Sequence, residues 1–153
     1  MEIRDFQSGD AAAFKALNEA WITRHFALEP SDRRVLDNPE SEVLAKGGLI
    51  LMGIEDGAAV GCVAMLAMAD GGFEVAKMAV DEARRGEGLG AAMMAACIAR
   101  ARMLRASRLY LESNLDLKPA ISLYERFGFR HLAPEERPPS PYARVSAWME
   151  LRL

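Results

Sequence analysis

A strand, a glycine-rich loop and a helix follow one another without interruption in residues 73–104. The apolar run Val75–Val80, broken only by one lysine, is typical of a buried strand. A charged bend comes next, and then three glycines at alternate positions, Gly86, Gly88 and Gly90. Apolar residues at three- and four-residue steps follow at once and predict a helix. This order places free backbone N–H groups at a helix N-terminus, where the helix dipole favours an anion.

The glycines and two neighbouring arginines predict a binding site for a pyrophosphate group. A glycine has no Cβ, so a phosphate can approach its backbone closely and the loop can adopt positive φ angles. Arg84 and Arg85 add positive charge beside the loop. The plain alternative is a glycine-rich loop that only turns the chain. We disfavour it because the motif stands between a strand and a helix, which is the setting that such a site requires.

Two classes of pyrophosphate ligand fit the loop. Gly86-x-Gly88-x-x-Ala91 satisfies the pattern of dinucleotide-binding proteins, and Glu112, at the end of the next apolar strand, could serve as their acidic ribose ligand. In that pattern the first glycine directly follows the strand, whereas five mostly charged residues intervene here. The dinucleotide pattern therefore leaves the two arginines unexplained.

The other class of ligand is coenzyme A, and two motifs support it. Arg85-x-x-Gly88-x-Gly90 matches the Q/R-x-x-G-x-G/A segment of the GCN5-related N-acetyltransferase (GNAT) family. Residues 120–129, AISLYERFGF, are similar to the A-I-x-L-Y-x-x-x-G-F signature of the same family. The motifs occur in the family's order with one predicted strand between them. The chain therefore resembles a GNAT enzyme over nearly its whole length, which implies an N-acetyltransferase that uses acetyl-CoA.

The predicted elements alternate in the order β-α-α-β-β-β-α-β-α-β-β, and Asp56-Gly57 predicts a tight hairpin. Expected strands cover residues 2–6, 49–55, 59–69, 73–80, 108–113, 129–132 and 143–153, and expected helices cover 11–27, a short segment around Val35, 89–104 and 119–127. We therefore expect residues 1–153 to form one α/β domain with a mixed, mostly antiparallel sheet and flanking helices, as in the GNAT fold.

The composition of the chain limits the classes of partner that we expect it to bind. Apolar residues make up 51% of the chain and charged residues 27%, which is ordinary for a globular protein. The net charge of −3 argues against nucleic acid as the main partner. Cys62 and Cys97 lie in apolar runs and are expected to be buried packing residues, and no metal site is visible. We see no signal peptide or membrane span and expect a cytoplasmic protein; a homodimer is left open.

The resemblance implies which residues hold the cofactor. It assigns the pyrophosphate to Arg85 and to the backbone of the loop and first helical turn, which comprises Gly86, Glu87, Gly88, Leu89, Gly90 and Ala91. The backbone of Met78, Ala79 and Val80 would pair with the pantetheine arm as though it were an added strand. One of those N–H groups would stabilise charge that develops on the thioester carbonyl.

Tyr124 falls on the family's general-acid tyrosine. With an ordinary pKa of ~10 it is protonated at neutral pH and can donate to the departing thiolate. The plain alternative is a core aromatic residue, since Tyr124 lies on the apolar face of its helix. The family commonly carries asparagine seven residues earlier, where this chain has Leu117, so we name the nearby Asn114 as a candidate cofactor contact.

Two glutamates are candidates for the base that accepts a proton from the amine, directly or through water. Glu112 lies twelve positions before Tyr124, and Glu74 begins the central strand. Some GNAT members carry a base at the first of these positions and others at the second. The plain alternative for each is a solvated residue at a strand end.

The sequence says less about the residues that would bind the acetyl acceptor. Trp21 and Phe26 could form one wall and Pro138–Tyr142 another, while Glu29 and Asp32 either recognise an ammonium group or cap the second helix. The acceptor could be a small amine, a peptide N-terminus or a lysine. A non-catalytic acyl-CoA-binding or sensing module is the alternative function, because the family's asparagine is replaced by Leu117.

Overall fold

The sheet begins as an antiparallel meander because tight turns join its first long strands. In the computed structural model, which describes residues 1–153, β2 (Leu49–Glu55) and β3 (Ala58–Ala67) are antiparallel. Asp56 and Gly57 between them have φ angles of 50° and 77°. Positive φ at both positions matches the right-handed twist of the flanking strands. The predicted hairpin is therefore confirmed.

Seven strands complete the sheet in the order β1-β2-β3-β4-β5-β7-β6. The remaining strands are β1 (Glu2–Asp5), β4 (Phe73–Val80), β5 (Arg108–Ser113), β6 (Arg130–His131) and β7 (Ala147–Arg152). Every neighbouring pair is antiparallel except β4 and β5. This arrangement confirms the predicted mixed, mostly antiparallel α/β class.

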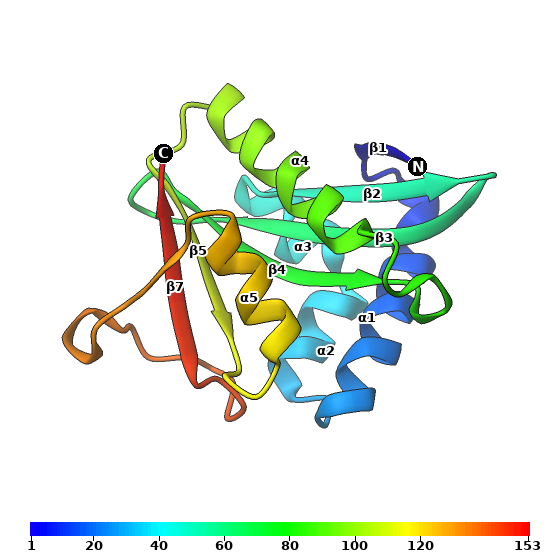
Figure 1. Ribbon diagram of the computed structural model, residues 1–153. Coiled ribbons are helices and arrows are strands. Elements are labelled where there is room, and N and C mark those ends of the chain that lie inside the picture. Colours follow the sequence, from blue (N-terminus) through cyan, green and yellow to red (C-terminus); the bar gives the residue numbers. More distant parts are fainter.

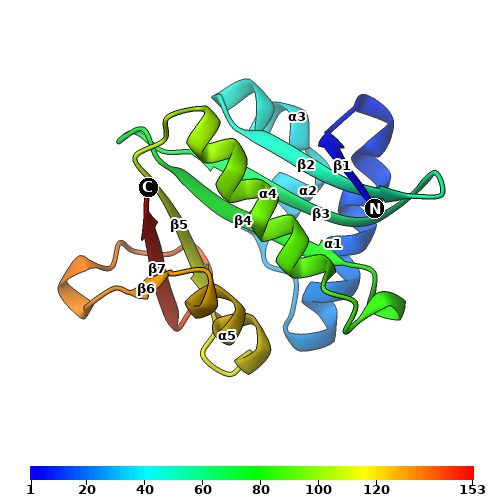
Figure 2. The same ribbon diagram turned by 45° about the horizontal axis from the view of Figure 1, so that its top comes forward.

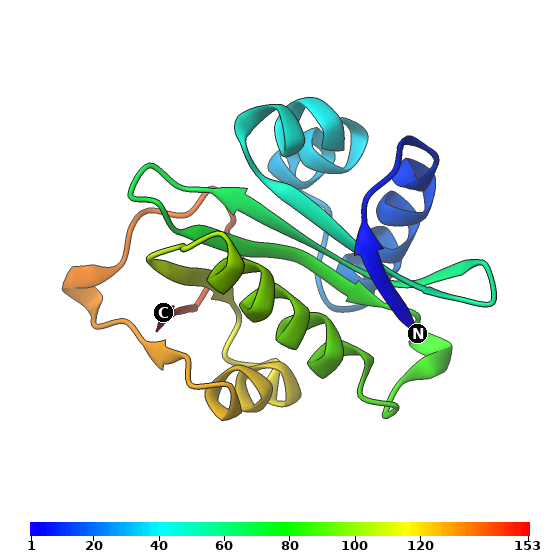
Figure 3. The same cartoon turned by 90° about the horizontal axis from the view of Figure 1, so that it is seen from above.

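Helices cover both faces of the sheet (Figures 1 and 3). α1 (Ala11–His25), α2 (Pro30–Asp37) and α3 (Pro39–Glu42) lie on one face, and α4 (Leu89–Met103) and α5 (Lys118–Arg126) on the other. The short α3 lies outside the predicted helices. Pro39 occupies the first turn of α3, where proline's missing N–H costs nothing. None of the helices has the length and apolar character needed to cross a membrane.

Each face of the sheet has its own hydrophobic core. Residues such as Met65, Met93 and Leu109 fill the space beneath α4 and α5, and residues such as Phe14 and Ile50 fill the space beneath α1 and α2. Two cores form because successive side chains of a strand point to opposite faces. The two cysteines are divided between them, both fully buried and free, as predicted.

The sheet opens where β4 meets β5 (Figures 1 and 2). The two strands pair only through Phe73 with Leu109 and Glu74 with Tyr110, and then diverge. The edge of β4 from Val75 onward consequently has no strand partner on the side of β5. This single parallel pair is also too little for a dinucleotide-binding fold, which is built from repeated βαβ units.

Candidate active site

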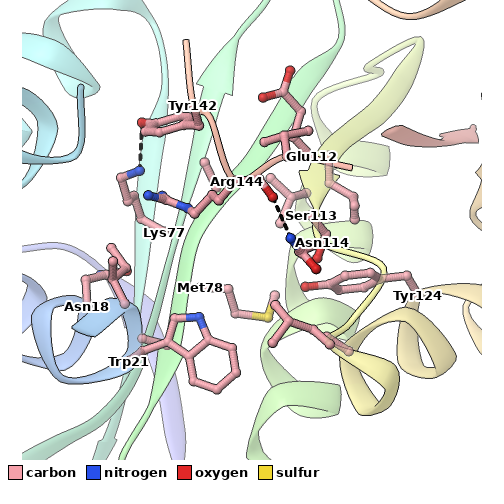
Figure 4. Close-up of a pocket in the computed structure, with 18 of the residues that line it drawn as sticks. Asn18, Trp21, Lys77, Met78, Glu112, Ser113, Asn114, Tyr124, Tyr142 and Arg144 are labelled. Atoms are coloured by element: carbon pink, nitrogen blue, oxygen red, sulfur yellow. Dashed lines mark hydrogen bonds between the residues drawn. The ribbon is translucent and has the colours of Figure 1, made fainter. Parts of the chain in front are cut away.

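A pocket of about 230 Å³ occupies the opening between the two halves of the sheet (Figure 4). Its walls come from α1, β4, β5, α5 and the segment that precedes β7. Fifteen of its 23 lining residues are hydrophobic, and the polar minority includes Glu74, Lys77, Glu112 and Arg144. An apolar pocket with a few converging polar groups is typical of a small-molecule site.

Unpaired backbone N–H groups gather at the start of α4. None of the N–H groups of Gly86, Gly88, Leu89, Gly90 and Ala91 donates a hydrogen bond within the chain; the first bond of the helix runs from Ala92 to Gly88 at 3.0 Å. Gly86 and Gly88 have φ angles of 79° and 78°, which favour glycine. A Cβ added to either glycine would have no other atom within 4 Å. The loop is therefore shaped to accept an anion on its backbone.

The two arginines beside the loop have different surroundings. Arg84 is bound within the chain, where its guanidinium contacts Glu87 at 2.8 Å and also pairs with Glu55. Arg85 is exposed and has no acidic partner. Glu87 itself uses its side chain for Arg84, and its N–H donates to the Arg84 carbonyl at 3.4 Å. Of these side chains, only Arg85 is free for a ligand.

A bulge shapes the strand that borders the pocket. The pairing of β3 with β4 shifts between Cys62 and Ala64, and Lys77 opposite this shift has a φ angle of 53°. The Cys62 thiol donates to the Lys77 carbonyl at 3.7 Å. A bulge bends its strand and redirects the groups that follow it. The segment Met78–Val80 therefore enters the pocket wall with its free edge toward the opening.

Tyr124 projects from α5 into the pocket, across from Met78 and Trp21 (Figure 4). Its hydroxyl makes no hydrogen bond within the chain. The ring packs against Phe129, with the ring centroids 6.1 Å apart. Burial raises the pKa of the phenol to about 12, so the hydroxyl keeps its proton at neutral pH. Tyr124 thus contributes to packing and also presents a free proton donor.

Glu74 and Glu112 lie at the end of the pocket where β4 and β5 still pair. Glu112 is fixed by two hydroxyl groups, which donate to it from Tyr110 at 2.6 Å and from Ser140 at 2.7 Å. Glu74 has no hydrogen-bond partner in the chain. Burial and the neighbouring Glu112 charge raise the pKa of Glu74 to about 7. The two carboxylates therefore differ in chemistry although they share one site.

Asn114 lines the pocket, but both ends of its amide are used within the chain. Its Nδ2 donates to the Arg144 carbonyl at 2.7 Å, and its Oδ1 accepts from the Asp116 N–H at 2.8 Å. These bonds tie the loop after β5 to the segment before β7. Whether Asn114 also contacts a cofactor stays a prediction.

The sequence patterns missed a buried charged cluster, which we define as Glu29, Asp32, Lys77, Tyr142 and Arg144. Asp32 is wholly buried and pairs with Lys77 at 2.9 Å and with Arg144 at 2.7 Å. Burial alone would raise the pKa of Asp32, but the Arg144 hydrogen bonds, the Glu29 N–H and the Lys77 charge lower it to about 2. One signal was available: Lys77 interrupts an apolar strand, and a buried charge requires a partner.

Comparison with known proteins decides the family. Residues 12–129 match the sequence model described as the acetyltransferase (GNAT) family, which is more than half of the chain. This chain belongs to the GNAT family. The predicted enzyme class, an acetyltransferase with acetyl-CoA as cosubstrate, is thereby confirmed. A search of curated proteins finds no match.

Solved structures share the fold of this chain. A GNAT acetyltransferase from Staphylococcus aureus has a TM-score of 0.88 at 17% identity, covering 99% of this chain and 98% of the other. A Salmonella typhimurium structure with its cofactor acetyl-CoA has a TM-score of 0.77 at 22% identity over 99% and 93%. N-acetylglutamate synthase from Neisseria gonorrhoeae, complexed with coenzyme A and N-acetylglutamate, has a TM-score of 0.77 at 28% identity, over 99% of this chain and 35% of that one.

Proposed function

We propose that this GNAT chain moves the acetyl group of acetyl-CoA to a primary amine by direct attack in a ternary complex. The observation that carries the proposal is that one pocket joins the free edge of β4, the Tyr124 hydroxyl and the Glu74–Glu112 pair. Acetyl-CoA supplies the acetyl group as a thioester. The experiment that tests this function is a panel of small amines and peptides, followed as amine-dependent release of coenzyme A.

The start of α4 fits the pyrophosphate of the cosubstrate. Five unpaired N–H groups and the positive end of the helix dipole favour a doubly charged group there, and Arg85 adds a free guanidinium. From this point the pantetheine arm would follow the unpaired edge of β4, pairing with the backbone of Met78, Ala79 and Val80. A polar backbone edge that lacks a strand partner is suited to an extended ligand.

Glu74 is the residue that we assign as the general base. A base works best when its pKa lies near the working pH, and burial together with the Glu112 charge gives Glu74 such a pKa, about 7. Its carboxylate is also free of partners within the chain. Glu112 would act on Glu74 through its charge, since its own oxygens are held by Tyr110 and Ser140.

Tyr124 is the residue that we assign as the general acid. Its hydroxyl stays protonated, has no acceptor within the chain and points into the pocket. A donor without a partner is available to protonate the leaving sulfur atom.

Direct attack is supported by the state of the two cysteines. Both are buried, neither lines the pocket, and burial raises the pKa of each thiol to about 12. The thiolate is the nucleophilic form of cysteine, so neither side chain is suited to carry an acetyl group. The amine would therefore attack without a covalent acyl-enzyme.

Replacing Gly90 by valine should weaken acetyl-CoA binding by about 10–100-fold. The valine side chain would block hydrogen bonds from the backbone to the charged pyrophosphate, and the loss of such bonds has an effect of this size. Gly90 suits this test better than Gly86 or Gly88, because its φ is not positive and an added Cβ meets only the Leu123 side chain at 3.8 Å. Calorimetric titration of acetyl-CoA measures the effect. Ala95→Val, on an exposed part of the same helix, is the control. An unchanged affinity in Gly90→Val would show that the loop does not bind acetyl-CoA.

Replacing Arg85 by alanine should have a smaller effect on the same titration, about a few-fold, because one exposed charge is screened by salt. The affinity of the variant should also depend less steeply on salt concentration than that of the wild type. Arg84→Ala should leave this salt dependence unaltered, since that guanidinium is already paired with Glu55 and Glu87. Equal salt dependence in the wild type and Arg85→Ala would show that Arg85 does not contact the ligand.

A further inference from the structure

The charged cluster borders the pocket through Lys77, Tyr142 and Arg144. Lys77 Nζ donates to Asp32 Oδ1 and to the Tyr142 hydroxyl, both at 2.9 Å. Arg144 donates to both Asp32 oxygens at 2.7 Å and to Glu29 at 3.2 Å. The side chains of Asp32, Lys77 and Arg144 are 0%, 6% and 18% exposed. These groups are therefore held in fixed positions.

The cluster presents only hydrogen-bond donors to the pocket. Lys77, Tyr142 and Arg144 line it, whereas the carboxylates Glu29 and Asp32 do not. Figure 4 shows Tyr142, Lys77 and Arg144 grouped at one end of the pocket. The two carboxylates accept hydrogen bonds from Lys77 and Arg144 without lining the pocket themselves. A group bound at this end consequently meets N–H and O–H donors and no competing carboxylate of the cluster.

Several of these donors have no acceptor within the chain. The Tyr142 hydroxyl accepts a hydrogen bond from Lys77, so its own proton is free to donate. Arg144 uses its Nη1 and Nη2 atoms for the carboxylates, and its Nε has no partner. Both donors are therefore available to an oxygen-bearing group of a ligand in the pocket.

The number of charges and acceptor atoms indicates which group that is. The cluster is neutral as a whole, because Glu29 and Asp32 balance the charges of Lys77 and Arg144. A carboxylate would bring two acceptor oxygens and one negative charge to the free donors, whereas a phosphate dianion would bring two negative charges to a neutral, partly buried cluster.

Other groups that line the pocket are suited to an ammonium. Glu74 and Glu112 line the pocket beside the cluster, and Glu74 is close enough to Lys77 for the lysine's charge to act on it. Asn18, which is 1% exposed and also lines the pocket, gives its Nδ2 to Phe14 and Cys62 and leaves its Oδ1 without a partner. The pocket thus has hydrogen-bond acceptors in addition to its donor side, which we define as Lys77, Tyr142 and Arg144.

We propose that the acetyl acceptor is a free amino acid, with its amine toward Glu74 and its carboxylate on Tyr142, Lys77 and Arg144. This inference rests on the proposed function and narrows it, since a lysine within a protein or a simple amine has no carboxylate for the donor side. Trp21 and Phe26 add aromatic surface to the same pocket, which favours an apolar side chain on the amino acid.

The test is a set of matched acceptors, each an L-amino acid and its carboxamide, measured by coenzyme A release with the purified protein. We expect at least one amino acid to exceed its carboxamide in kcat/KM by ~10-fold or more, because a site built for a hydrogen-bonded group rejects an analogue that lacks it. The carboxamide has the more readily deprotonated amine, so amine basicity alone would give the opposite preference. Decarboxylated amines and peptides with a free N-terminus complete the set.

Tyr142→Phe is the matched variant, because it removes the free O–H and keeps both ion pairs of Asp32. It should lower kcat/KM for the preferred amino acid by ~10-fold and change that for the carboxamide by less than about twofold. Arg85→Ala is the control: it should alter the KM for acetyl-CoA and leave the acid-to-amide ratio as in the wild type. If the cluster served only to hold the segment before β7 in place, Tyr142→Phe would instead lower the melting temperature without changing the acid-to-amide ratio of kcat/KM.

The outcomes separate this inference from the function on which it rests. Turnover of amines with no preference for the carboxylate, or an unchanged ratio in Tyr142→Phe, would overturn the amino-acid acceptor and leave the N-acetyltransferase intact. If no amine of any kind were acetylated while acetyl-CoA still bound, the proposed function would fall, and the acceptor with it.

Discussion

Glu74→Gln is expected to lower kcat/KM at neutral pH by ~10²–10⁴-fold, the usual loss when a general base is removed. In the wild type, kcat/KM should rise with pH and level off above about 7, because the carboxylate must lose its proton before it can accept one and its pKa is about 7. Glutamine cannot take up a proton, so this rise should be absent from the variant. The measurement is a pH profile of kcat/KM for both proteins with one amine acceptor.

Glu112→Gln is the matched control for the base. It removes the neighbouring negative charge that helps to raise the Glu74 pKa, while the amide oxygen can accept from one of the two hydroxyl groups of Tyr110 and Ser140 and the amide NH2 can donate to the other. The rise in kcat/KM should therefore move to lower pH, with the rate above pH 8 within about threefold of the wild type. If Glu112→Gln suffered the large loss and Glu74→Gln did not, the two roles would be reversed. If neither lost more than about threefold, the amine would be deprotonated by water instead.

Tyr124→Phe is expected to lower kcat by ~10²-fold or more while acetyl-CoA affinity stays within a few-fold. A proton that is donated only as the carbon–sulfur bond breaks stabilises the transition state and adds little to ground-state binding. The melting temperature should hardly change, because the hydroxyl makes no hydrogen bond within the chain and phenylalanine keeps the ring beside Phe129. Single-turnover kinetics and calorimetry together measure the three quantities.

Phe129→Leu is a useful control for Tyr124, because it disturbs the same aromatic pair without touching the hydroxyl. Phe129 is buried, so its loss should lower the melting temperature and leave kcat near that of the wild type. The reverse result, with unaltered turnover and a lowered melting temperature in Tyr124→Phe, would show that Tyr124 is only a core residue.

The order of strands and helices could be predicted because local signals mark each element. β2 begins and ends at the predicted residues because Gly47-Gly48 precedes it and Asp56-Gly57 follows it. β5 does so because its side chains alternate between two faces. The last strand was expected to begin at residue 143 and begins at Ala147. Residues 143–146 instead use their backbone and side chains to contact Glu29, Asp32, Asn114 and Leu115.

The chemistry of the site was predictable only in part. The glycine loop and Tyr124 belong to short continuous motifs, so their places could be inferred from the resemblance of those motifs to the GNAT family. The charged cluster could not, because its partners are distant in sequence: 45 positions separate Asp32 from Lys77, and 112 separate Asp32 from Arg144. The unequal roles of Arg84 and Arg85 likewise depend on Glu55, which approaches the loop only through the fold.

The measurement that most directly tests the central claim is an initial-rate study in which acetyl-CoA and an accepted amine are both varied. We expect double-reciprocal lines that intersect, because both substrates must occupy the pocket before the acetyl group moves, with one acetylated amine formed for each coenzyme A released. Parallel lines would indicate a covalent acyl-enzyme and contradict direct attack. Tight binding of acetyl-CoA with no amine-dependent release of coenzyme A would contradict the transferase itself.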